Sequence, residues 1–587
     1  MNDNQARRGV SFLKDLSHES DRYLHTQPPF EEGTPVRIIP LGGSEEIGGR
    51  NMTVIEYGKD IIIVDMGLKF PEEDQPGIDY LIPNPTYLKG KEDKIRGVVI
   101  THGHMDHIGA VPQVMGMIGN PPIYATPLTM AMMQRRQAEH VTAPKLNGHV
   151  VRPGEQIRLG CFTVDILHIN HSIPDSTALK IQTPEGTLVH TGDFKIDKEP
   201  MGEEPADLQL YRSIGDEGVD ILLSDSTDVR KPGSAVSETT IHNNIDAIFE
   251  QAEGRVLVAL FSSALNRLQQ IINISEKYGR YVVTEGYSMR NNIQIIQELN
   301  YAHFSPKVII SPQEAQKLPP EKVTILCTGS QGEDKAALMR IANKEHRFFQ
   351  IEKGDTVIFS SSVIPGNEGS IQHLKDLISR QRAKIIHYRM MDVHVGGHAP
   401  QADLKLMLEL IRPRYLQPIY GDFHSLRMHK DMAVSVGMDP NHVLLTDNGR
   451  VVELYQGQAR VTTERVPAHN MMVDGLGVGD LHEIVIRDRQ HMAQDGIITA
   501  IVVIDKNKRT VLQDPEIISK GFVYMKSSYK LIEAIQKKVR EIAESKMSKD
   551  MDPNEDYIKK AIQEELGSFL YEKTHRRPMI LPALMEV

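Results

Sequence analysis

The chain has 587 residues, a formal net charge of −11 and 40% hydrophobic residues. This length exceeds what one hydrophobic core usually supports, so it predicts about three or four domains. The two cysteines, Cys161 and Cys327, exclude a disulfide framework and a zinc site built mainly from thiolates. The acidic excess excludes indiscriminate coating of nucleic acid, because phosphate binding needs local positive potential.

The N-terminal segment, residues 1–33, is polar and charged, and its composition favours a disordered tail. It lacks the apolar core of a signal peptide, and no later apolar run is long enough to span a bilayer. We therefore expect a cytoplasmic protein that makes no membrane contact.

Strand-like segments alternate with helical ones from Val36 onward. Runs rich in Ile and Val end in Gly or Asp turns, as in VRIIPLGG, MTVIEY, DIIIVDMG and IRGVVITHG. Helical patterns such as PLTMAMMQRRQAEH follow them, so the expected fold class is α/β. Between roughly Asp228 and Tyr388 a second alternating set includes RVLVALF, KVTILCTG and DTVIFSS. This set predicts an inserted, doubly wound α/β domain.

The C-terminal part predicts a separate small domain. The stretch around Pro467 to Gly479 has the composition of a linker. Beyond it lie the strand-like GIITAIVVID and two amphipathic helices, with apolar stripes at Leu531, Ile535, Val539 and Ile542 and at Ile558, Ile562, Leu566 and Phe569. Such stripes usually pack a domain's own core, and a contact between identical chains is the less frequent alternative.

The motif THGHMDHIG, directly after the strand-like IRGVVI, carries the sharpest chemical signal. Neutral imidazole and carboxylate are ligands that suit zinc and related divalent ions. Because a loop after a strand can aim alternate side chains into one site, we expect His102 and His104 to face one ion. Asp106 and His107 are then expected to face a second.

Further ligands come from other strand ends. His171 stands in HSIPDS and Asp193 in HTGDFK, each after a strand-like run. A carboxylate can bridge two cations, so Asp193 is the candidate bridge. Asp65 in IIIVDMG is the candidate carboxylate that orients a ligand imidazole. The alternative is a His-rich polar surface, but four ligand-type residues in six positions favour a metal site.

Several motifs together resemble the metallo-β-lactamase part of the ribonuclease J family: LGGSEEIGGRN, VDMGLKFPEE, GIDYLIP, THGHMDHIG, HSIPDS and HTGDFKID. Later motifs resemble the family's β-CASP nucleic-acid-processing domain and the return to the lactamase core: LLSDST, FSSALNRLQQ, CTGSQGE, SSSVIPGNE and HVGGHA. The resemblance implies a metallo-β-lactamase αββα sandwich with an inserted β-CASP α/β domain and a small α/β C-terminal domain.

The resemblance also implies a division of the chain. We expect a tail at residues 1–33, the first part of the metallo-β-lactamase domain at 34–227, the β-CASP domain at 228–388, the second lactamase part at 389–465, a linker at 466–479 and a C-terminal domain at 480–587. The C-terminal domain is expected to serve oligomerisation or RNA contact.

The family's activity implies a 5′-to-3′ exoribonuclease with some endonuclease activity in RNA processing and decay. The substrate is then single-stranded RNA with a 5′-monophosphate. The expected assembly is a homodimer or homotetramer within an RNA-decay assembly. Two Zn²⁺ ions are expected, with Mn²⁺ or Mg²⁺ as alternatives. Carried over by motif, one ion is held by His102, His104 and His171 and the other by Asp106 and His107, with Asp193 between them.

The expected mechanism is in-line attack on phosphorus by a metal-activated hydroxide. His398 of HVGGHA is the candidate for leaving-group protonation or phosphate contact, with Asp225 of LLSDST as its orienting partner, and Asp106 has a catalytic role beside its ligand role. Hydroxyls and loop amides bind anions well, so the terminal phosphate of RNA is expected at Ser360, Ser361, Ser362, His394, Gly396 and Gly397. A merely polar serine loop is the alternative.

One position departs from the family pattern. Where the family usually has Pro-Val/Ile-His-Gly-Glu, the chain reads PIYGDFHS, which puts Tyr420 in place of an expected histidine ligand. A phenol of normal pKa is a poor neutral ligand, although a cation can promote its deprotonation. The second metal site is therefore expected to be weak, differently built or empty at rest. His424, four residues on, is a less favoured substitute.

Other functions compete with an active ribonuclease. Tyr420 motivates an RNA-binding or scaffolding protein with reduced catalysis, and a DNA-processing β-CASP nuclease is a near alternative. A small thioester or lactam hydrolase needs only the lactamase core, so the inserted domain argues against it. The presence of the other ligand-type residues favours an active nuclease.

Overall fold

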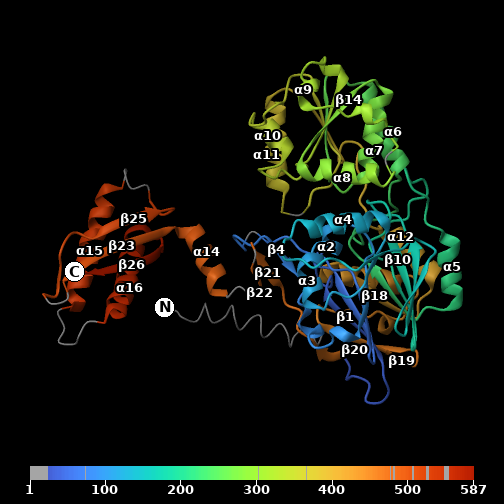
Figure 1. Cartoon of the computed structure of the whole chain (residues 1–587), viewed down its shortest axis with the longest axis horizontal. Helices are drawn as coiled ribbons and strands as arrows, with labels where there is room; N and C mark the ends of the chain where they lie inside the picture. Colours follow the sequence, from blue (N-terminus) through green and yellow to red (C-terminus); the bar gives the residue numbers. More distant parts are fainter. Residues whose placement is uncertain are drawn as a thin grey trace. The chain divides into compact units, whose positions relative to one another are not determined.

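The computed structural model describes residues 24–587 except 73, 302, 365, 476, 480–482, 506–507, 524–527 and 548–553 (Figure 1). The chain divides into two compact units, residues 1–69 with 82–470 and residues 70–81 with 471–587. Most of the tail expected at residues 1–33 lies outside the described residues. Its last part is described, and there Gln27 forms a β-bridge with Thr462 while Leu24 is buried.

The first sheet of the larger unit has eight strands in the order β20-β19-β1-β2-β3-β5-β6-β7. The strands are β20 (Gln458–Arg465), β19 (Arg450–Tyr455), β1 (Val36–Gly42), β2 (Met52–Tyr57), β3 (Asp60–Val64), β5 (Ile95–Val99), β6 (Ile123–Ala125) and β7 (Gly148–Val150). Strands from both ends of this part of the chain thus complete one sheet, because β1 pairs with β19.

The second sheet has six strands in the order β18-β12-β11-β10-β9-β8. These are β18 (Tyr415–Ile419), β12 (Ile221–Asp225), β11 (Gly186–His190), β10 (Thr177–Thr183), β9 (Phe162–His168) and β8 (Gln156–Leu159). One buried cluster contains Ile38 and Ile62 of the first sheet together with Phe162 and Leu188 of the second, so the sheets pack face to face.

Helices cover the outer faces of this sandwich. On the second sheet, side chains of α5 (Leu208–Glu217), α12 (Gln401–Ile411) and α13 (Phe423–Ser435) form a buried cluster with Leu222 and Leu416. On the first sheet, α4 (Pro127–Ala138) packs on β6 and β7, beside α3 (Val111–Met117). This is the αββα arrangement that the sequence predicted, and it is confirmed.

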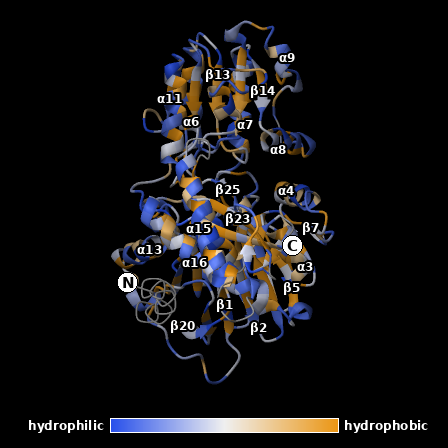
Figure 2. Ribbon diagram, turned by 90° about the vertical axis from the view of Figure 1, so that its left-hand side faces the viewer, coloured by the Kyte–Doolittle hydropathy of each residue, from blue (hydrophilic) through white to orange (hydrophobic). Residues whose placement is uncertain are grey.

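The inserted domain has a five-stranded, all-parallel sheet in the order β14-β15-β13-β16-β17. Its strands are β13 (Val256–Ala259), β14 (Tyr281–Glu285), β15 (Val323–Cys327), β16 (Thr356–Phe359) and β17 (Lys384–His387). Helices α6 (Glu238–Glu250), α7 (Leu265–Lys277) and α8 (Tyr287–Glu298) bury apolar side chains on one face, and α10 (Ala337–Ala342) and α11 (Glu368–Arg380) do so on the other. Figure 2 shows the hydrophobic strands between these mainly hydrophilic helix surfaces, so the doubly wound prediction is confirmed.

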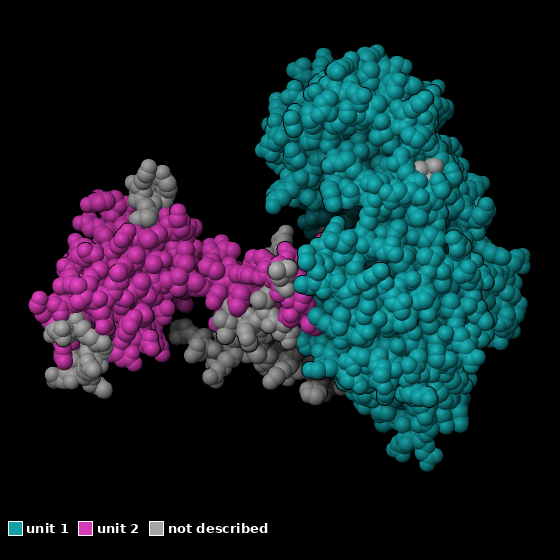
Figure 3. All heavy atoms as spheres, in the orientation of Figure 1, with its two compact units in different colours: residues 1–69, 82–470 teal, residues 70–81, 471–587 magenta. Residues whose placement is uncertain are grey.

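The smaller unit begins with a three-stranded sheet, in which β4 (Tyr80–Ile82) pairs with β21 (Met471–Asp474), and β21 with β22 (Gly477–Gly479) (Figure 3). The segment predicted to be a linker, 466–479, therefore contains paired strands. After α14 (Glu483–Asp495), the strand β23 (Ile497–Asp505) pairs with β24 (Thr510–Val511), β25 (Glu516–Lys520) and β26 (Met579–Glu586).

Two long helices, α15 (Tyr529–Met547) and α16 (Glu555–Thr574), pack on this last sheet. Their predicted apolar stripes supply its buried core, in which Ile535, Val539, Ile562 and Leu566 are fully buried. The stripes therefore pack their own domain. Within the described part of the chain, every helix is too short or too polar to traverse a lipid bilayer.

Candidate metal centre

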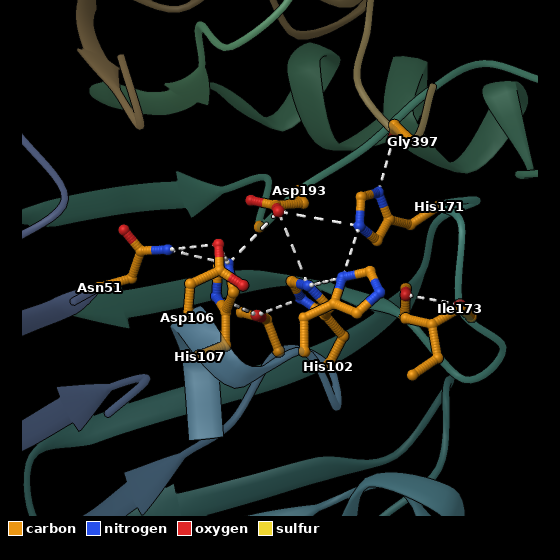
Figure 4. Close-up of polar contacts among 12 residues, drawn as sticks. Asn51, His102, Asp106, His107, His171, Ile173, Asp193 and Gly397 are labelled. Carbon is orange, nitrogen blue, oxygen red and sulfur yellow. Dashed lines mark hydrogen bonds and ion pairs between the residues drawn. The ribbon is translucent and has the colours of Figure 1, made fainter. Parts of the chain in front are cut away.

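Strands of both sheets of the sandwich end at one place and bring the predicted ligands together (Figure 4). His102 and His104 follow β5, and the short helix α2 (Met105–Ile108) carries Asp106 and His107. This helix lies on the side of the sandwich that faces the five-stranded sheet (Figure 1). Loops after β9 and β11 supply the remaining two ligands, His171 and Asp193.

Asp193 belongs to three groups of potential ligand atoms, the third of which consists of Asp193, Asp225 and His398. The first group is His102, His104, His171 and Asp193, whose ligand atoms lie within 4.8 Å of one another. Asp193 Oδ2 is 3.6 Å from His102 Nε2 and 3.7 Å from His171 Nε2. The second group is Asp106, His107 and Asp193, with His107 Nε2 3.3 Å from Asp193 Oδ2. The arrangement pairs the residues as the spacing of the motifs suggested.

The donor set fits divalent cations. Asp193 Oδ1 is buried and has no hydrogen-bond partner among the described residues, which is a costly arrangement unless a cation completes it. Burial, together with the neighbouring imidazoles, lowers the pKa of His102 and His171 well below the usual histidine value. Burial lowers the pKa of His104 to about 4. These rings are neutral at pH 7, so their lone pairs are available to a metal.

Asp65 orients His107. Its Oδ2 lies 2.7 Å from His107 Nδ1, and its carboxylate also accepts hydrogen bonds from the backbone N–H and the hydroxyl of Thr101. His107 Nε2 is thereby directed at Asp193 and Asp106. The pKa of His107 is raised well above the usual histidine value. Burial opposes this rise, but the carboxylates of Asp193, Asp65 and Asp106 outweigh burial.

Two residues of this centre were missed by the sequence analysis. Asn51 places its amide nitrogen 2.9 Å from His107 Nε2 and 3.5 Å from Asp106 Oδ2. Gly67 leaves room for α2, because a Cβ there would lie 1.5 Å from the Asp106 carbonyl oxygen. Both stand in motifs quoted above, GGRN and VDMG, and these motifs were the only signal for them.

His398 and Asp225 lie beside the metal ligands. His398 Nδ1 is 2.8 Å from Asp225 Oδ2 and 3.9 Å from Asp193 Oδ2. Asp225 Oδ1 accepts hydrogen bonds from the backbone N–H and the hydroxyl of Thr227. Burial lowers the pKa of His398, but Asp225 and Asp193 outweigh it and raise the pKa to about 10. These two carboxylates thus favour the protonated ring, which is the form that can donate a proton.

The segment before His398 approaches the ligands closely. His171 Nδ1 donates a hydrogen bond of 2.6 Å to the Gly397 carbonyl, which directs His171 Nε2 towards Asp193 (Figure 4). A Cβ on Gly397 would lie 2.3 Å from His171 Cε1, so only glycine fits. A Cβ on Gly396 would lie 3.0 Å from Asp228.

The predicted phosphate-binding serines differ from one another. Ser360 donates its hydroxyl hydrogen to the Val393 carbonyl at 2.7 Å, so this hydrogen is already engaged within the protein. Ser361 accepts a hydrogen bond from Gln331, which leaves its own hydroxyl hydrogen available to an acceptor. Ser362 and His394 are partly exposed, and burial lowers the pKa of His394 to about 3.

Tyr420 lies next to His107, and its hydroxyl contacts Asp65 and His190. Its hydroxyl is 3.3 Å from both Asp65 Oδ2 and His190 Nε2, and its ring packs edge-on against His107. Burial and the neighbouring carboxylates raise the pKa of Tyr420 well above its usual value, so the phenol is neutral and donates a hydrogen bond. His424 lies on α13 and has no described contact with these groups.

Comparison with known proteins identifies the family. The chain is 38% identical to ribonuclease J2 of Bacillus subtilis over 552 residues, which cover 94% of this chain and 99% of that protein. The chain belongs to the ribonuclease J family. It is also 39% identical to ribonuclease J 1 of Streptococcus pyogenes over 94% of this chain and 97% of that protein. Ribonuclease J of Helicobacter pylori is 39% identical over 85% of this chain and 72% of that protein.

Family models match each main part of this ribonuclease J family member. The metallo-β-lactamase superfamily matches residues 46–257, the ribonuclease J β-CASP domain 253–378 and the ribonuclease J C-terminal domain 484–587. A crystal structure of a protein of unknown function from Enterococcus faecalis covers 72% of the chain with a TM-score of 0.51 and 16% identity, which is a likeness of fold alone.

Proposed function

We propose that the chain is a metal-dependent ribonuclease that hydrolyses phosphodiester bonds. The observation that carries this proposal is the position of Asp193, which joins two groups of His and Asp ligands and lies 3.9 Å from the His398–Asp225 pair. Two ligand groups around one carboxylate, with a proton donor beside them, suit phosphodiester hydrolysis. The names of the curated relatives supply the substrate class, RNA.

The residues that would hold the cations are those of the two groups. One cation would be held by His102, His104 and His171 and the other by Asp106 and His107, with Asp193 between them. Bound cations would activate water and offset the negative charge on the phosphoryl oxygens. Imidazole and carboxylate ligands favour Zn²⁺, with Mn²⁺ or Mg²⁺ as alternatives.

The chain's own proton donor is His398. Asp225 keeps the ring oriented by accepting from Nδ1, and Thr227 keeps Asp225 in place with two hydrogen bonds. His398 Nε2 is therefore the atom that protonates the leaving oxygen. Asp106 belongs to the second ligand group, where its carboxylate would help to hold the cation that activates water.

The second cation is held more weakly than the first. Tyr420 remains a neutral phenol hydrogen-bonded to Asp65 and His190, so the second group has Asp106, His107 and the shared Asp193 as its ligands. The first group has three imidazoles besides Asp193. Fewer protein ligands give a lower affinity and leave more positions to water.

The substrate is single-stranded RNA with a 5′-monophosphate, degraded from 5′ to 3′ with some endonuclease activity. Ser361, Ser362, His394 and the amides of Gly396 and Gly397 receive the terminal phosphate, because they offer hydrogen-bond donors and the last three stand within four residues of His398 along the chain. The protein functions in the cytoplasm as a homodimer or homotetramer in RNA processing and decay. As domain ranges we propose those expected from the sequence, with β21 and β22 lying within the segment 466–479.

The experiment compares matched strands. Purified protein with Zn²⁺ or Mn²⁺ is incubated with 5′-monophosphorylated RNA and with DNA of the same sequence. We expect hydrolysis of RNA, lost in His104→Ala and retained in His373→Ala, which alters an exposed histidine on α11. RNA binding without hydrolysis under every metal would instead support a scaffold, and preferential cleavage of DNA a DNA-processing nuclease.

A further inference from the structure

A buried network of charges joins the metal centre to the inserted domain. Lys195 follows Asp193 by two residues, and its Nζ lies 3.1 Å from Glu238 Oε1 and 3.3 Å from Asp197 Oδ2. Glu238 begins α6, and its other oxygen accepts from Arg267 Nη2 of α7 at 2.5 Å. Each of these side chains belongs to a residue at most 7% exposed. The network thus fixes the Arg267 guanidinium in one place.

Arg267 uses its other terminal nitrogen to hold a backbone carbonyl. Arg267 Nη1 donates to Val393 O and to Ser360 Oγ, each at 3.0 Å. Ser360 in turn donates to Val393 O at 2.7 Å. The Val393 carbonyl therefore receives two hydrogen bonds, one from α7 and one from the residue that follows β16.

Val393 begins the segment that ends at His398. Residues 393–398 form neither helix nor strand and contain Gly396 and Gly397, so the segment has little stiffness of its own. Its far end is held by the His171–Gly397 and His398–Asp225 hydrogen bonds. Its near end is held by the two hydrogen bonds to the Val393 carbonyl, by the burial of the Val393 side chain in the core of the inserted domain and by the hydrogen bond from Asn244 to the neighbouring Asp392 carbonyl. Of these contacts, the ones to the Val393 carbonyl lie nearest to His398 along the chain.

We infer that Arg267 is a positioning residue for His398. The ion pair with Glu238 fixes the guanidinium, the guanidinium and Ser360 fix the Val393 carbonyl, and that carbonyl fixes the start of the segment bearing His398. Ser360 then acts on this segment and does not bind the terminal phosphate. The inference rests on the proposed ribonuclease function.

A second buried ion pair of the same domain provides a matched control. Arg255 Nε lies 2.9 Å and Nη2 2.6 Å from the two carboxylate oxygens of Asp355. Both residues are buried, at 8% and 2% exposure. They precede β13 and β16, whereas Arg267 and Ser360 follow those strands. Arg255 therefore shares the burial and the domain of Arg267 but touches the opposite end of the sheet.

The test compares Arg267→Lys with Arg255→Lys in the full chain loaded with Zn²⁺. We measure kcat and KM on 5′-monophosphorylated single-stranded RNA, the bound zinc and the melting temperature. For Arg267→Lys we expect kcat to fall about 100-fold, the cost of a displacement near 1 Å, with KM and zinc content unchanged. Arg255→Lys should lower the melting temperature comparably and leave kcat at the wild-type value. Equal losses of kcat, or loss of zinc from Arg267→Lys alone, would overturn the inference.

Ser360→Ala tests the same step without unpairing a charge, and it decides the question if Arg267→Lys does not fold. We expect kcat to fall about tenfold on RNA with either a 5′-monophosphate or a 5′-hydroxyl. A loss confined to 5′-monophosphorylated RNA would show a phosphate ligand and overturn the inference, as would unchanged kcat. Wild-type protein that hydrolyses no RNA would refute the proposed function itself, and the inference with it.

Discussion

Asp225→Asn tests the proton donor directly. Asp225 Oδ1 accepts two hydrogen bonds from Thr227, and Oδ2 accepts from His398 Nδ1 at 2.8 Å. An asparagine has one oxygen, so its amide group must replace one of these two acceptors. If the amide NH2 faces His398, it meets the Nδ1–H, which is also a donor. The clash is relieved only when Nδ1 loses its proton, and this loss removes the positive charge from the ring. If the NH2 faces Thr227, two hydrogen bonds are lost.

We expect kcat to fall about 1000-fold, within the range for loss of a positioned acid, which corresponds to about 4 kcal/mol in the barrier. KM for RNA and the bound zinc should not change, because the six metal ligands remain in place. Single-turnover decay of labelled RNA measures the chemical step, and metal analysis of the same sample measures the zinc. The control is Asp246→Asn, because the Asp246 carboxylate pairs with Lys277 on the inserted domain, away from the metal ligands. A kcat within a few-fold of the wild type would refute the assignment of His398.

Further changes probe other parts of the account. Gly397→Ala should reduce both kcat and zinc content, because the new Cβ would lie 2.3 Å from His171, whereas Gly369→Ala, which meets no atom within 4 Å, should alter neither. Tyr420→His should increase the zinc bound per chain in a calorimetric titration, because it adds an imidazole beside the second group. An unchanged stoichiometry would argue against a second cation site limited by Tyr420. Burial raises the pKa of Glu203 from 4.5 to about 8, so between these pH values the folded state keeps a proton that the unfolded state has released. The free energy of unfolding therefore falls as the pH rises from about 4.5 towards 8. Glu203→Gln should therefore raise the free energy of unfolding by about 2 kcal/mol at pH 9 and little at pH 4, as denaturant titrations would show. Removing zinc with a chelator should lower the melting temperature. Zinc added back at about 100 times its Kd should restore the melting temperature and add about 2.7 kcal/mol to the free energy of unfolding. An unchanged melting temperature would indicate that the folded protein does not bind zinc.

The local parts of the site could be predicted from the sequence. His102, His104, Asp106 and His107 lie within six consecutive positions, so one turn after one strand determines how they diverge. Alternation of apolar runs also predicted the sandwich and the inserted sheet, because burial on a given face requires that periodicity. His171 and Asp193 could be added because their motifs also follow strands, and strand ends meet at one edge of a fold.

Contacts between distant segments could not be predicted. Spacing does not show that Ser360 gives its hydrogen to Val393, because this contact depends on how the inserted domain meets the segment that returns to the sandwich. It does not show that Arg267 and Glu238 meet either, because this contact depends on how α6 and α7 pack together. The same holds for Tyr420, whose hydroxyl finds Asp65 across 355 positions of sequence. Residues 24–33 were expected to belong to a tail from their composition alone, although Phe30 packs against Tyr455.

The most direct test of the metal centre is anomalous diffraction from zinc-soaked crystals of the full chain. We expect two peaks that share Asp193, the stronger one within about 2.0–2.1 Å of imidazole nitrogens of His102, His104 and His171. The second peak, bordered by Asp106 and His107, should have the lower occupancy. Zinc bound elsewhere on the molecule, with these side chains turned away from one another, would contradict the account.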